Sequence, residues 1–353
     1  MAERIRHSGP ITFAEFMQTA LYHPELGYYA VASPGIGRAG DFMTSPEVSS
    51  LFGSMLARHV VEIWRAAGAP AEWTVVELGG GTGAMAADIH AALEADEPDL
   101  LAGLVYVIVE SSPTLRLRQQ LKLRRYPQVK WVESPDELGV VEQGHVISNE
   151  FFDALPVHRI TIAEGKLLEL CVGLDGDEFV DSPGQPSTPE IAEYFRLAGV
   201  APAEGNIAEV NLLAPRLTGD IAGRLKRGVI TTLDFGYPAE ELYASWRRQG
   251  TLLCFYRHAA SDDPYRRVGK QDITAHVDFS ALARTAEAQG FAVRKLASQM
   301  EFLSGLGIVA AAQAPGLPLE EQAARRRALH ELIDPAGLGR IRVQIALKGL
   351  VLA

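Results

Sequence analysis

The sequence predicts an α/β fold built on a doubly wound, mostly parallel sheet, with an N-terminal helical segment and an antiparallel β insertion. The first observation is a series of four short apolar runs of the kind that a parallel sheet buries on both faces. They are "WTVVEL", "GLVYVIVE", "VKWVE" and "HVISNE", between residues 73 and 150. The second is that helical stretches, "AMAADIHAALEA" and "PTLRLRQQLKLRRY", lie between the first three runs. This alternation is typical of a βαβ series.

The N-terminal part, residues 1–70, is expected to be helical and to pack on the core. The stretch "ITFAEFMQTALY" has the pattern of a short amphipathic helix that ends before Pro24. A longer helix is expected to begin at Ser45, which would be its N-cap with Pro46 in the first helical position. Its apolar residues recur with the helical period, and it should end near Gly68.

The alternation of strands and helices is interrupted after Pro156. The stretch "VHRITIAEGKLLELCVGLDGDEFV" reads as three strands joined by turns at Glu164-Gly165 and Asp175-Gly176. We therefore divide the α/β domain into a first half, an antiparallel insertion that forms a substrate cleft, and a second half with a long loop at 237–277. These three parts are residues 71–156, 157–210 and 211–353.

Composition narrows the class of protein. The chain has 353 residues, 47% of them apolar, and a net charge of -11, which does not favour nucleic acid as a partner. The two cysteines form no CxxC pair, so neither a disulfide framework nor a metal site is expected. No signal peptide or apolar run of membrane-spanning length is present. We expect a cytoplasmic protein without a membrane partner, and the sequence leaves open whether it forms an oligomer.

A glycine-rich stretch, "VVELGGGTGAM", follows the first strand. It places Gly79, Gly81 and Gly83 at a strand-to-helix turn, where the missing side chains let a ligand approach the helix N-terminus. Two cofactor classes use such a turn. The string also satisfies GxGxxA through Gly79, Gly81 and Ala84, so the glycines alone leave a dinucleotide site open.

Carboxylates at two strand ends bear on the choice of cofactor. Glu77 precedes the first glycine by two residues, where its charge would repel a pyrophosphate and attract a cation. S-adenosylmethionine carries an ammonium and a sulfonium and no phosphate, so it fits Glu77 better than NAD does. Glu110, at the end of the next strand, is placed to bind both ribose hydroxyls of either cofactor. The pattern favours a methyltransferase.

Four further residues are candidates for cofactor binding. Asp41, Thr44 and Ser45 precede a helix start whose free N–H groups could hold the cofactor's carboxylate. Ser134 follows the third strand, where it could meet the adenine. For Ser45 and Ser134, a simple helix-capping role is the alternative.

The fourth strand runs into "SNEFFDALP", residues 148–156. Asn149, Glu150 and Asp153 offer oxygens that could bind the hydrogens of a target nitrogen, and carboxylates suit a guanidinium in particular. By strand alternation, only one of Phe151 and Phe152 is expected to face the site. The alternatives are a buried strand that runs into a polar turn capped by Asp153, a site for a small amine, and a site for the cofactor's own ammonium.

Together "GDFMTSPEVSSLFG", "VVELGGGTG", "NEFFDALPVH" and "DITAHVDF" make the chain similar to the MidA family, from about residue 10 to the last strand. The resemblance implies a class I methyltransferase-like (Rossmann-like) fold, S-adenosylmethionine as cofactor and an arginine of a protein as acceptor. The family includes a mitochondrial assembly factor of respiratory complex I that dimethylates an arginine, so the substrate could be a homologue of a complex I subunit. Gly80 and Thr82 stand where the family typically has Pro and Arg.

We therefore expect an S-adenosylmethionine-dependent methyltransferase that acts on a protein nitrogen, and the resemblance specifies an arginine guanidinium. Acids and aromatic residues alone would indicate only a cation. Three alternatives remain open: a cofactor-binding assembly factor with little turnover, a small-molecule N-methyltransferase, and an NAD-linked oxidoreductase.

Overall fold

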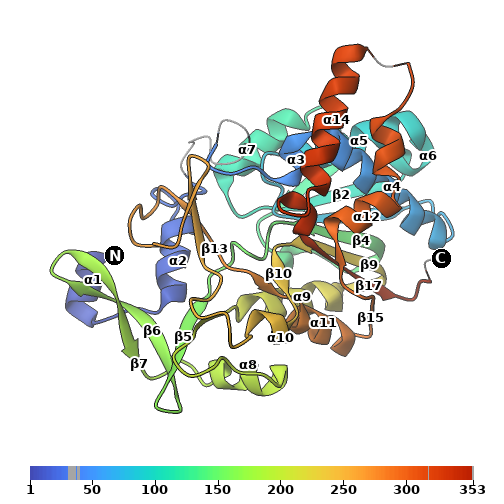
Figure 1. The fold of residues 1–353 in the computed structure, drawn as a ribbon. Helices are drawn as coiled ribbons and strands as arrows, with labels where there is room; N and C mark the ends of the chain where they lie inside the picture. Colours follow the sequence, from blue (N-terminus) through green and yellow to red (C-terminus); the bar gives the residue numbers. More distant parts are fainter. Residues whose placement is uncertain (31–36, 38–39, 317, 352–353) are drawn as a thin grey trace. The chain divides into compact units, whose positions relative to one another are not determined.

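The computed structural model describes residues 1–30, 37, 40–316 and 318–351 (Figure 1). The chain forms two compact units. The insertion unit contains Met1–Gly35, Phe152–Thr218 and Gly236–Thr285, and the core-sheet unit contains Ile36–Phe151, Gly219–Phe235 and Ala286–Ala353. This grouping differs from the predicted parts, because the N-terminal 70 residues are divided between the two units and residues 236–285 join the insertion unit.

The core-sheet unit is built on an eight-stranded sheet of strand order β15-β17-β9-β4-β1-β2-β3, with β16 paired to β17. Its strands are β1 (Trp73–Leu78), β2 (Leu104–Val109), β3 (Val129–Val132), β4 (Val141–Asn149), β9 (Leu225–Asp234), β15 (Ala292–Val293), β16 (Ala297–Ser298) and β17 (Arg342–Lys348). Strands β1, β2, β3, β4 and β9 are parallel, whereas β17 runs antiparallel to β9. The predicted α/β class and the four predicted parallel strands are confirmed.

Two helices of the core-sheet unit precede β1, and the others lie between its strands. The helices are α3 (Ser45–Val48), α4 (Ser50–Ala66), α5 (Ala84–Asp96), α6 (Pro98–Ala102), α7 (Pro113–Lys122), α12 (Gln299–Gly305), α13 (Ile308–Ala312) and α14 (Leu319–Ile333), with the short 3-10 turns Pro135–Glu137 and Leu338–Arg340. Among the described residues, no helix is both long enough and apolar enough to cross a membrane.

The single helix predicted from Ser45 to near Gly68 is wrong in one respect. The backbone is extended at Ser49, with φ -170°, so the chain forms α3 and α4 separately. The Ser49 side chain accepts a hydrogen bond from the Leu51 N–H and thereby caps α4. Ser45 is the first residue of α3 and does not serve as the cap that we predicted.

Helices α4 and α5 approach each other closely at Gly53. A Cβ atom at this position would lie 2.3 Å from Cβ of Asp88, which is far too short for two carbon atoms. We predict that Gly53→Ala lowers the free energy of unfolding by roughly 1–3 kcal/mol, because the helices must move apart. Urea unfolding measures this, with Gly305→Ala as the matched control, since a Cβ at Gly305 meets nothing within 4 Å. Equal stability of Gly53→Ala and wild type would contradict the close approach.

A buried pair of histidines lies in the core of the same unit. His59 Nε2 is 3.1 Å and His145 Nε2 is 2.9 Å from Oγ1 of Thr231, and their rings are 5.1 Å apart. Burial lowers the pKa of His59 from 6.5, although Glu62 acts in the opposite direction. Burial and the neighbouring His59 lower the pKa of His145 well below 6.5. Both rings are therefore neutral at pH 7.

These lowered pKa values predict a loss of stability in acid. The unfolded chain binds a proton at His145 below pH 6.5, whereas the folded chain does not, so unfolding is favoured as the pH falls through this value. Relative to His145→Gln, the wild type should lose about 1.4 kcal/mol of unfolding free energy per pH unit below 6.5. Denaturant unfolding from pH 7.5 to 5.5 measures the difference, and the exposed His7→Gln is the control. A constant difference would show that His145 is protonated in the folded state.

The insertion unit contains a four-stranded antiparallel sheet of order β7-β6-β5-β8. Its strands are β5 (His158–Ala163), β6 (Lys166–Asp175), β7 (Glu178–Gly184) and β8 (Ile207–Val210). The turn at Glu164-Gly165 has left-handed φ values of 52° and 70°, as a tight hairpin requires. The three predicted strands and the turn at Glu164-Gly165 are confirmed, and the second turn lies one residue later than predicted, at Gly176-Asp177.

The rest of the insertion unit is helical or made of short strands. Its helices are α1 (Ala2–Ser8), α2 (Phe13–Tyr22), α8 (Glu190–Ala198) and α10 (Ala239–Leu242), and its short strands are β10 (Gly236–Tyr237), β11 (Leu253–Tyr256), β12 (Ala259–Ser261), β13 (Asp272–Thr274) and β14 (Val277–Asp278). Helices α9 (Leu213–Arg224) and α11 (Phe279–Ala288) contain residues of both units. The prediction of one long loop at 237–277 is therefore partly wrong, because β11, β12 and β13 form a three-stranded sheet within this segment.

Candidate active site

The strand order of the core-sheet unit reverses at β1, which pairs with β2 on one side and β4 on the other. In the register, Leu78 lies beside Val109 of β2 and Ser148 of β4. The segments that follow these three parallel strands consequently meet at one edge of the sheet. This is the place where open α/β sheets bind ligands.

The glycine loop after β1 has the backbone that its sequence predicts. Gly79, Gly81 and Gly83 have φ values of 69°, 51° and 79°, which side chains of L-residues rarely allow. Gly83 is the N-cap of α5. A Cβ atom on Gly79 would lie 2.6 Å from Cδ2 of Phe151, so this glycine lets the Phe151 ring pack directly on the loop.

Glu77 lies at the end of β1 and is 1% exposed. Its Oε2 accepts a hydrogen bond of 2.8 Å from the Tyr106 hydroxyl of β2. Burial is the main cause that raises the pKa of Glu77; the Tyr106 bond opposes it and nearby Glu110 adds to it, and the resulting pKa is about 7. A carboxyl group in this state ionises readily when a cation approaches it. Tyr106 was missed from the sequence, because it reads there as one more apolar residue of a buried strand.

Glu110 follows β2 and is also buried. Its Oε1 accepts the Ser112 N–H at 2.9 Å, and its Oε2 accepts an N–H of the Gln119 side chain at 3.0 Å. Burial raises the pKa of Glu110, and these hydrogen bonds and Arg116 oppose that effect. Both oxygens are thus held in place, and each retains a lone pair for a further donor.

The start of α3 is hydrogen-bonded to the segment that follows β4, at the same end of the sheet. Ser45 donates its N–H to Oε1 of Glu150 at 3.1 Å and its hydroxyl to Oε1 of Gln299 at 3.0 Å. Thr44 precedes α3 as its N-cap without a capping hydrogen bond from its side chain. Asp41 is buried. At the helix start that we predicted to hold the cofactor's carboxylate, the Ser45 N–H is therefore engaged by a carboxylate of the protein.

Ser134 caps the short turn Pro135–Glu137, and its Oγ accepts the Asp136 N–H at 3.2 Å. Ser134 therefore has the helix-capping role that we gave as the alternative to adenine binding. The hydroxyl proton remains available in this geometry, so a contact with adenine stays a prediction.

The end of β4 brings two of the predicted acceptor-side residues together. Asn149 Nδ2 donates to Oε1 of Glu150 at 3.0 Å. The Asn149 Oδ1 atom is buried and, within the described part of the chain, has no hydrogen-bond partner. A buried oxygen without a donor is costly, so this atom marks a position at which a ligand N–H or O–H would be stabilised.

The backbone at Glu150 is strained. Its φ is +48°, an unusual value for a residue with a side chain, and such strain costs roughly 1–3 kcal/mol and is concentrated at functional sites. The conformation is held by the Glu150 N–H, which donates to the Leu233 carbonyl at 2.8 Å. Asp234, at the end of β9, accepts the Phe151 N–H at 3.1 Å and the Phe235 N–H at 2.8 Å.

The third predicted acceptor residue, Asp153, belongs to the insertion unit. Its carbonyl accepts the Ala275 N–H at 2.9 Å within that unit. Phe152, also in that unit, is 3% exposed, whereas Phe151 is partly exposed. The expectation that one of the two rings fills a core agrees with this burial. A shared site for Asp153 with Glu150 remains a prediction.

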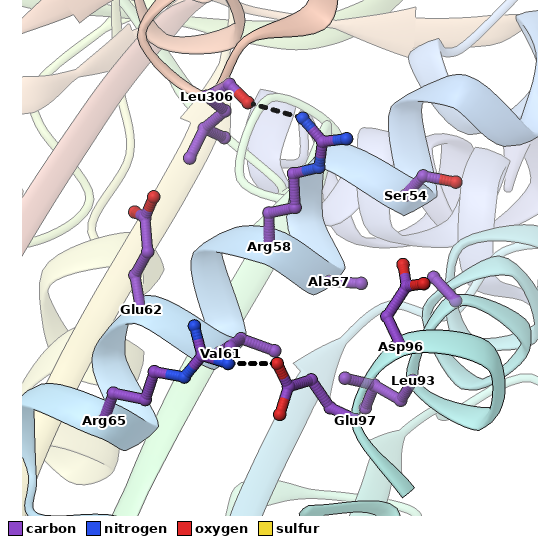
Figure 2. Close-up of a pocket in the computed structure, with 11 residues that line it drawn as sticks. Ser54, Ala57, Arg58, Val61, Glu62, Arg65, Leu93, Asp96, Glu97 and Leu306 are labelled. Atoms are coloured by element: carbon purple, nitrogen blue, oxygen red, sulfur yellow. Dashed lines mark hydrogen bonds and ion pairs between the residues drawn. The ribbon is translucent and has the colours of Figure 1, made fainter. Parts of the chain in front are cut away.

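A surface pocket of about 320 Å³ lies between α4 and α5 (Figure 2). Arg58 donates to the Leu306 carbonyl at its rim, and Arg65 pairs with Glu97. None of the predicted cofactor or acceptor residues lines this pocket. Its paired charges join the helices, so we do not assign it to the reaction. Among the described residues, no group of three potential ligands could hold a metal ion.

The comparisons with known proteins identify the family. A family model described as an S-adenosyl-L-methionine-dependent methyltransferase matches residues 55–297. The chain belongs to this family. A COG1565 superfamily member from Burkholderia thailandensis, crystallised with S-adenosyl-homocysteine, is 33% identical with a TM-score of 0.89 over 99% of this chain and 91% of that one. The predicted enzyme class, cofactor and class I methyltransferase-like fold are confirmed.

Curated relatives make the family assignment more specific. "Protein arginine methyltransferase NDUFAF7 homolog, mitochondrial" of Drosophila melanogaster is 32% identical in an alignment that covers 81% of this chain and 69% of that protein. "Protein arginine methyltransferase NDUFAF7, mitochondrial" of Danio rerio is 30% identical in an alignment that covers 96% of this chain and 83% of that protein. The resemblance to the MidA family, to which these relatives correspond, is confirmed.

The predicted cytoplasmic location is corrected by these relatives. Both are named as mitochondrial proteins. The prediction used the low cysteine content, which separates reducing from oxidising compartments and does not distinguish one reducing compartment from another.

The geometry of the core-sheet unit fits the cofactor of the family. The three left-handed glycines free the N-terminus of α5, and the buried Glu77 and Glu110 offer acceptors for cationic and hydroxyl groups. S-adenosylmethionine supplies the electrophilic methyl group of the reaction.

Proposed function

We propose that this protein transfers a methyl group from S-adenosylmethionine to the side chain of an arginine in another protein. The support for arginine is the name of the curated relatives, which are protein arginine methyltransferases. The support within the chain is the carboxylate-rich end of β4. A protonated guanidinium needs acceptors for up to five N–H groups, and carboxylate and amide oxygens supply them.

The observation that carries this proposal is Oδ1 of Asn149, the last residue of β4, which is buried and has no hydrogen-bond partner among the described residues. The strained Glu150 follows it directly. Glu150 accepts from Nδ2 of Asn149 and so orients the amide with its oxygen available to a ligand. In the proposed site, this oxygen accepts a hydrogen from the reacting nitrogen. Glu150 adds negative charge, and Asp153 is proposed to complete the guanidinium site.

Catalysis then depends mainly on positioning. A guanidinium is protonated at neutral pH and becomes nucleophilic when one nitrogen is aimed at the methyl group and its charge is drawn toward the carboxylates. Correct orientation of two reactants can contribute roughly 7–11 kcal/mol to lowering a barrier. A carboxylate of the site takes up the proton that the methylated nitrogen loses.

Cofactor contacts are proposed for the residues at the same edge. Glu77 would attract the ammonium or sulfonium, Gly79, Gly81 and Gly83 would let the cofactor approach α5, and Glu110 would bind the ribose hydroxyls. Asp41, Thr44, Ser45 and Ser134 are proposed as further cofactor contacts.

The test is transfer of a labelled methyl group to proteins from cells that lack this gene. Purified protein and labelled S-adenosylmethionine are added to the extract, and the modified residue is identified by mass spectrometry. The proposal requires label in methylarginine, and the modified protein identifies the substrate. A respiratory complex I subunit is the proposed substrate. Label found only on lysine or only on small molecules would overturn the arginine assignment.

An assembly factor with little turnover is the second candidate, and it predicts a different outcome. Such a protein would bind S-adenosylmethionine and its partner without transferring label.

A further inference from the structure

The side chain of Gln119, on α7, is completely buried against the glycine loop. Its Nε2 donates to the Gly81 carbonyl and to Oε2 of Glu110, each at 3.0 Å. Its Oε1 accepts the Trp131 indole N–H at 3.0 Å. One amide therefore joins the loop after β1, the acid after β2 and the end of β3.

The three partners match an amide and no other side chain of similar size. A carbonyl and a carboxylate oxygen can only accept, and an indole N–H can only donate. Glutamine offers two N–H groups and one oxygen in the complementary arrangement. A glutamate would place a second oxygen against the two acceptors, and a methionine would leave all three partners without a hydrogen bond.

The glycine loop is shaped around this residue. A Cβ atom on Gly80 would lie 2.9 Å from Nε2 of Gln119 and 2.7 Å from Cγ2 of Ile108. A Cβ atom on Gly83 would lie 3.3 Å from the Gln119 Cα atom. Two of the loop's glycines thus make room for Gln119 on the protein side, in addition to any room they make for the cofactor.

We propose that Gln119 is a positioning residue for S-adenosylmethionine, which fixes the Gly81 backbone and the Glu110 carboxylate in the arrangement that binds the cofactor. It acts through these two groups. Oε1 of Glu110 is held separately by the Ser112 N–H, so loss of the Gln119 bond removes one of the two hydrogen bonds that fix the carboxylate and leaves Oε2 less well held. The cofactor's ribose would then meet a disordered acceptor.

The test compares Gln119→Glu, Gln119→Met and Gln120→Glu in the full chain. Gln120 is the exposed neighbour on the same helix, so its variant introduces the same charge without touching the network. The dissociation constant for S-adenosyl-homocysteine is measured by calorimetry at several pH values between 5.5 and 8, and each value is divided by that of the wild type. Melting temperatures are measured in parallel.

We expect Gln119→Met to weaken binding about 10- to 100-fold at every pH, as is typical when a hydrogen bond to a charged group is lost. Gln119→Glu should bind at least as weakly at pH 8 and recover part of the loss at pH 5.5, because a protonated carboxyl can again donate to one acceptor. The charged groups near this position are Glu110, with Glu77 behind it, and Arg116, which donates to the Glu110 carbonyl at 2.8 Å. Gln120→Glu should bind like the wild type.

A role in folding alone would lower the melting temperature of Gln119→Glu without a recovery of relative affinity in acid. Wild-type affinity in both Gln119 variants would also overturn the proposal. If Gln119→Glu does not fold, Gln119→Met decides by itself, since the proposal requires a folded protein with weakened binding. None of these outcomes depends on which molecule accepts the methyl group.

Discussion

Replacing Glu77 with glutamine is expected to weaken cofactor binding about 10- to 100-fold at pH 8, through loss of a charged partner for the cofactor's cationic groups. The wild-type affinity itself should rise with pH through 7. The pKa of the buried Glu77 carboxyl is raised to about 7, so it is mostly protonated at pH 6. A cation favours the ionised form, and binding in acid must therefore displace this proton, whereas binding at pH 8 need not.

The same pKa shift determines the sign of a stability effect. The Glu77 pKa lies above its ordinary value of 4.5, so between these values the folded chain binds a proton that the unfolded chain does not. The cofactor-free protein should accordingly lose stability at this residue as the pH rises from 4.5 through 7, in the opposite direction to the effect of His145. A bound cation offsets the loss.

Calorimetric titration with S-adenosyl-homocysteine at pH 6, 7 and 8 measures the Glu77 effect. S-adenosyl-homocysteine keeps the ammonium of the cofactor and lacks its sulfonium. An effect of Glu77 seen with both ligands therefore comes from the ammonium, and an effect seen only with S-adenosylmethionine comes from the sulfonium. The exposed Glu72→Gln, just before β1, is the matched control and should bind like the wild type. A wild-type affinity that is flat or falls with pH would show that Glu77 does not face a cation.

Strands β1, β2 and β3 could be predicted almost residue by residue, whereas β4 begins four residues before the predicted run. "WTVVEL" coincides with β1, and the runs for β2 and β3 extend each strand by at most two residues. Strands that are buried on both faces must be continuously apolar, and glycine or polar residues delimit them, so local sequence contains most of the information. The hairpin at Glu164-Gly165 was predictable for a similar reason, because a tight turn requires particular residues.

Elements that depend on distant contacts could not be predicted in this way. Strands β11, β12 and β13 are three or four residues long, and their pairing joins Leu253 to Thr274 across the segment that reads as polar loop. The apolar period continues through Ser49, although the backbone there is extended. Periodicity reports which face is buried and does not report a local break between two helices.

At the site, the sequence predicted which residues follow the strands and not how they are paired. Glu150 and Ser45 are 105 positions apart, and their hydrogen bond follows from the tertiary structure alone. Gln119 was missed because the basic run around it reads as a solvated helix face. Its spacing of four residues from the buried Leu123 would have placed it on the inner face of α7.

Replacing Asn149 with alanine is expected to lower the rate of methyl transfer about 100- to 1000-fold while cofactor affinity changes little. Its Oδ1 atom is buried without a partner in the described chain and is the proposed acceptor for the reacting nitrogen. Removal of one preorganised polar group from an active site has an effect of this size. Asn149→Asp keeps an oxygen that can accept the hydrogen but places a second carboxylate against Oε1 of Glu150, so its activity relative to alanine should increase as the pH is lowered and one of the two carboxyls binds a proton.

Glu150→Gln isolates the charge from the hydrogen-bond network. The glutamine oxygen can still accept the Ser45 N–H, so the backbone at this strained residue is retained, while the negative charge that would hold a guanidinium is lost. We expect single-turnover methylation of an arginine-containing substrate to slow and S-adenosyl-homocysteine binding to persist, with the exposed Glu142→Gln of the same strand as control. Because both variants leave Glu77, Glu110 and the glycine loop intact, loss of cofactor binding in either would reassign the end of β4 to the cofactor. Full activity in both would exclude it from the reaction.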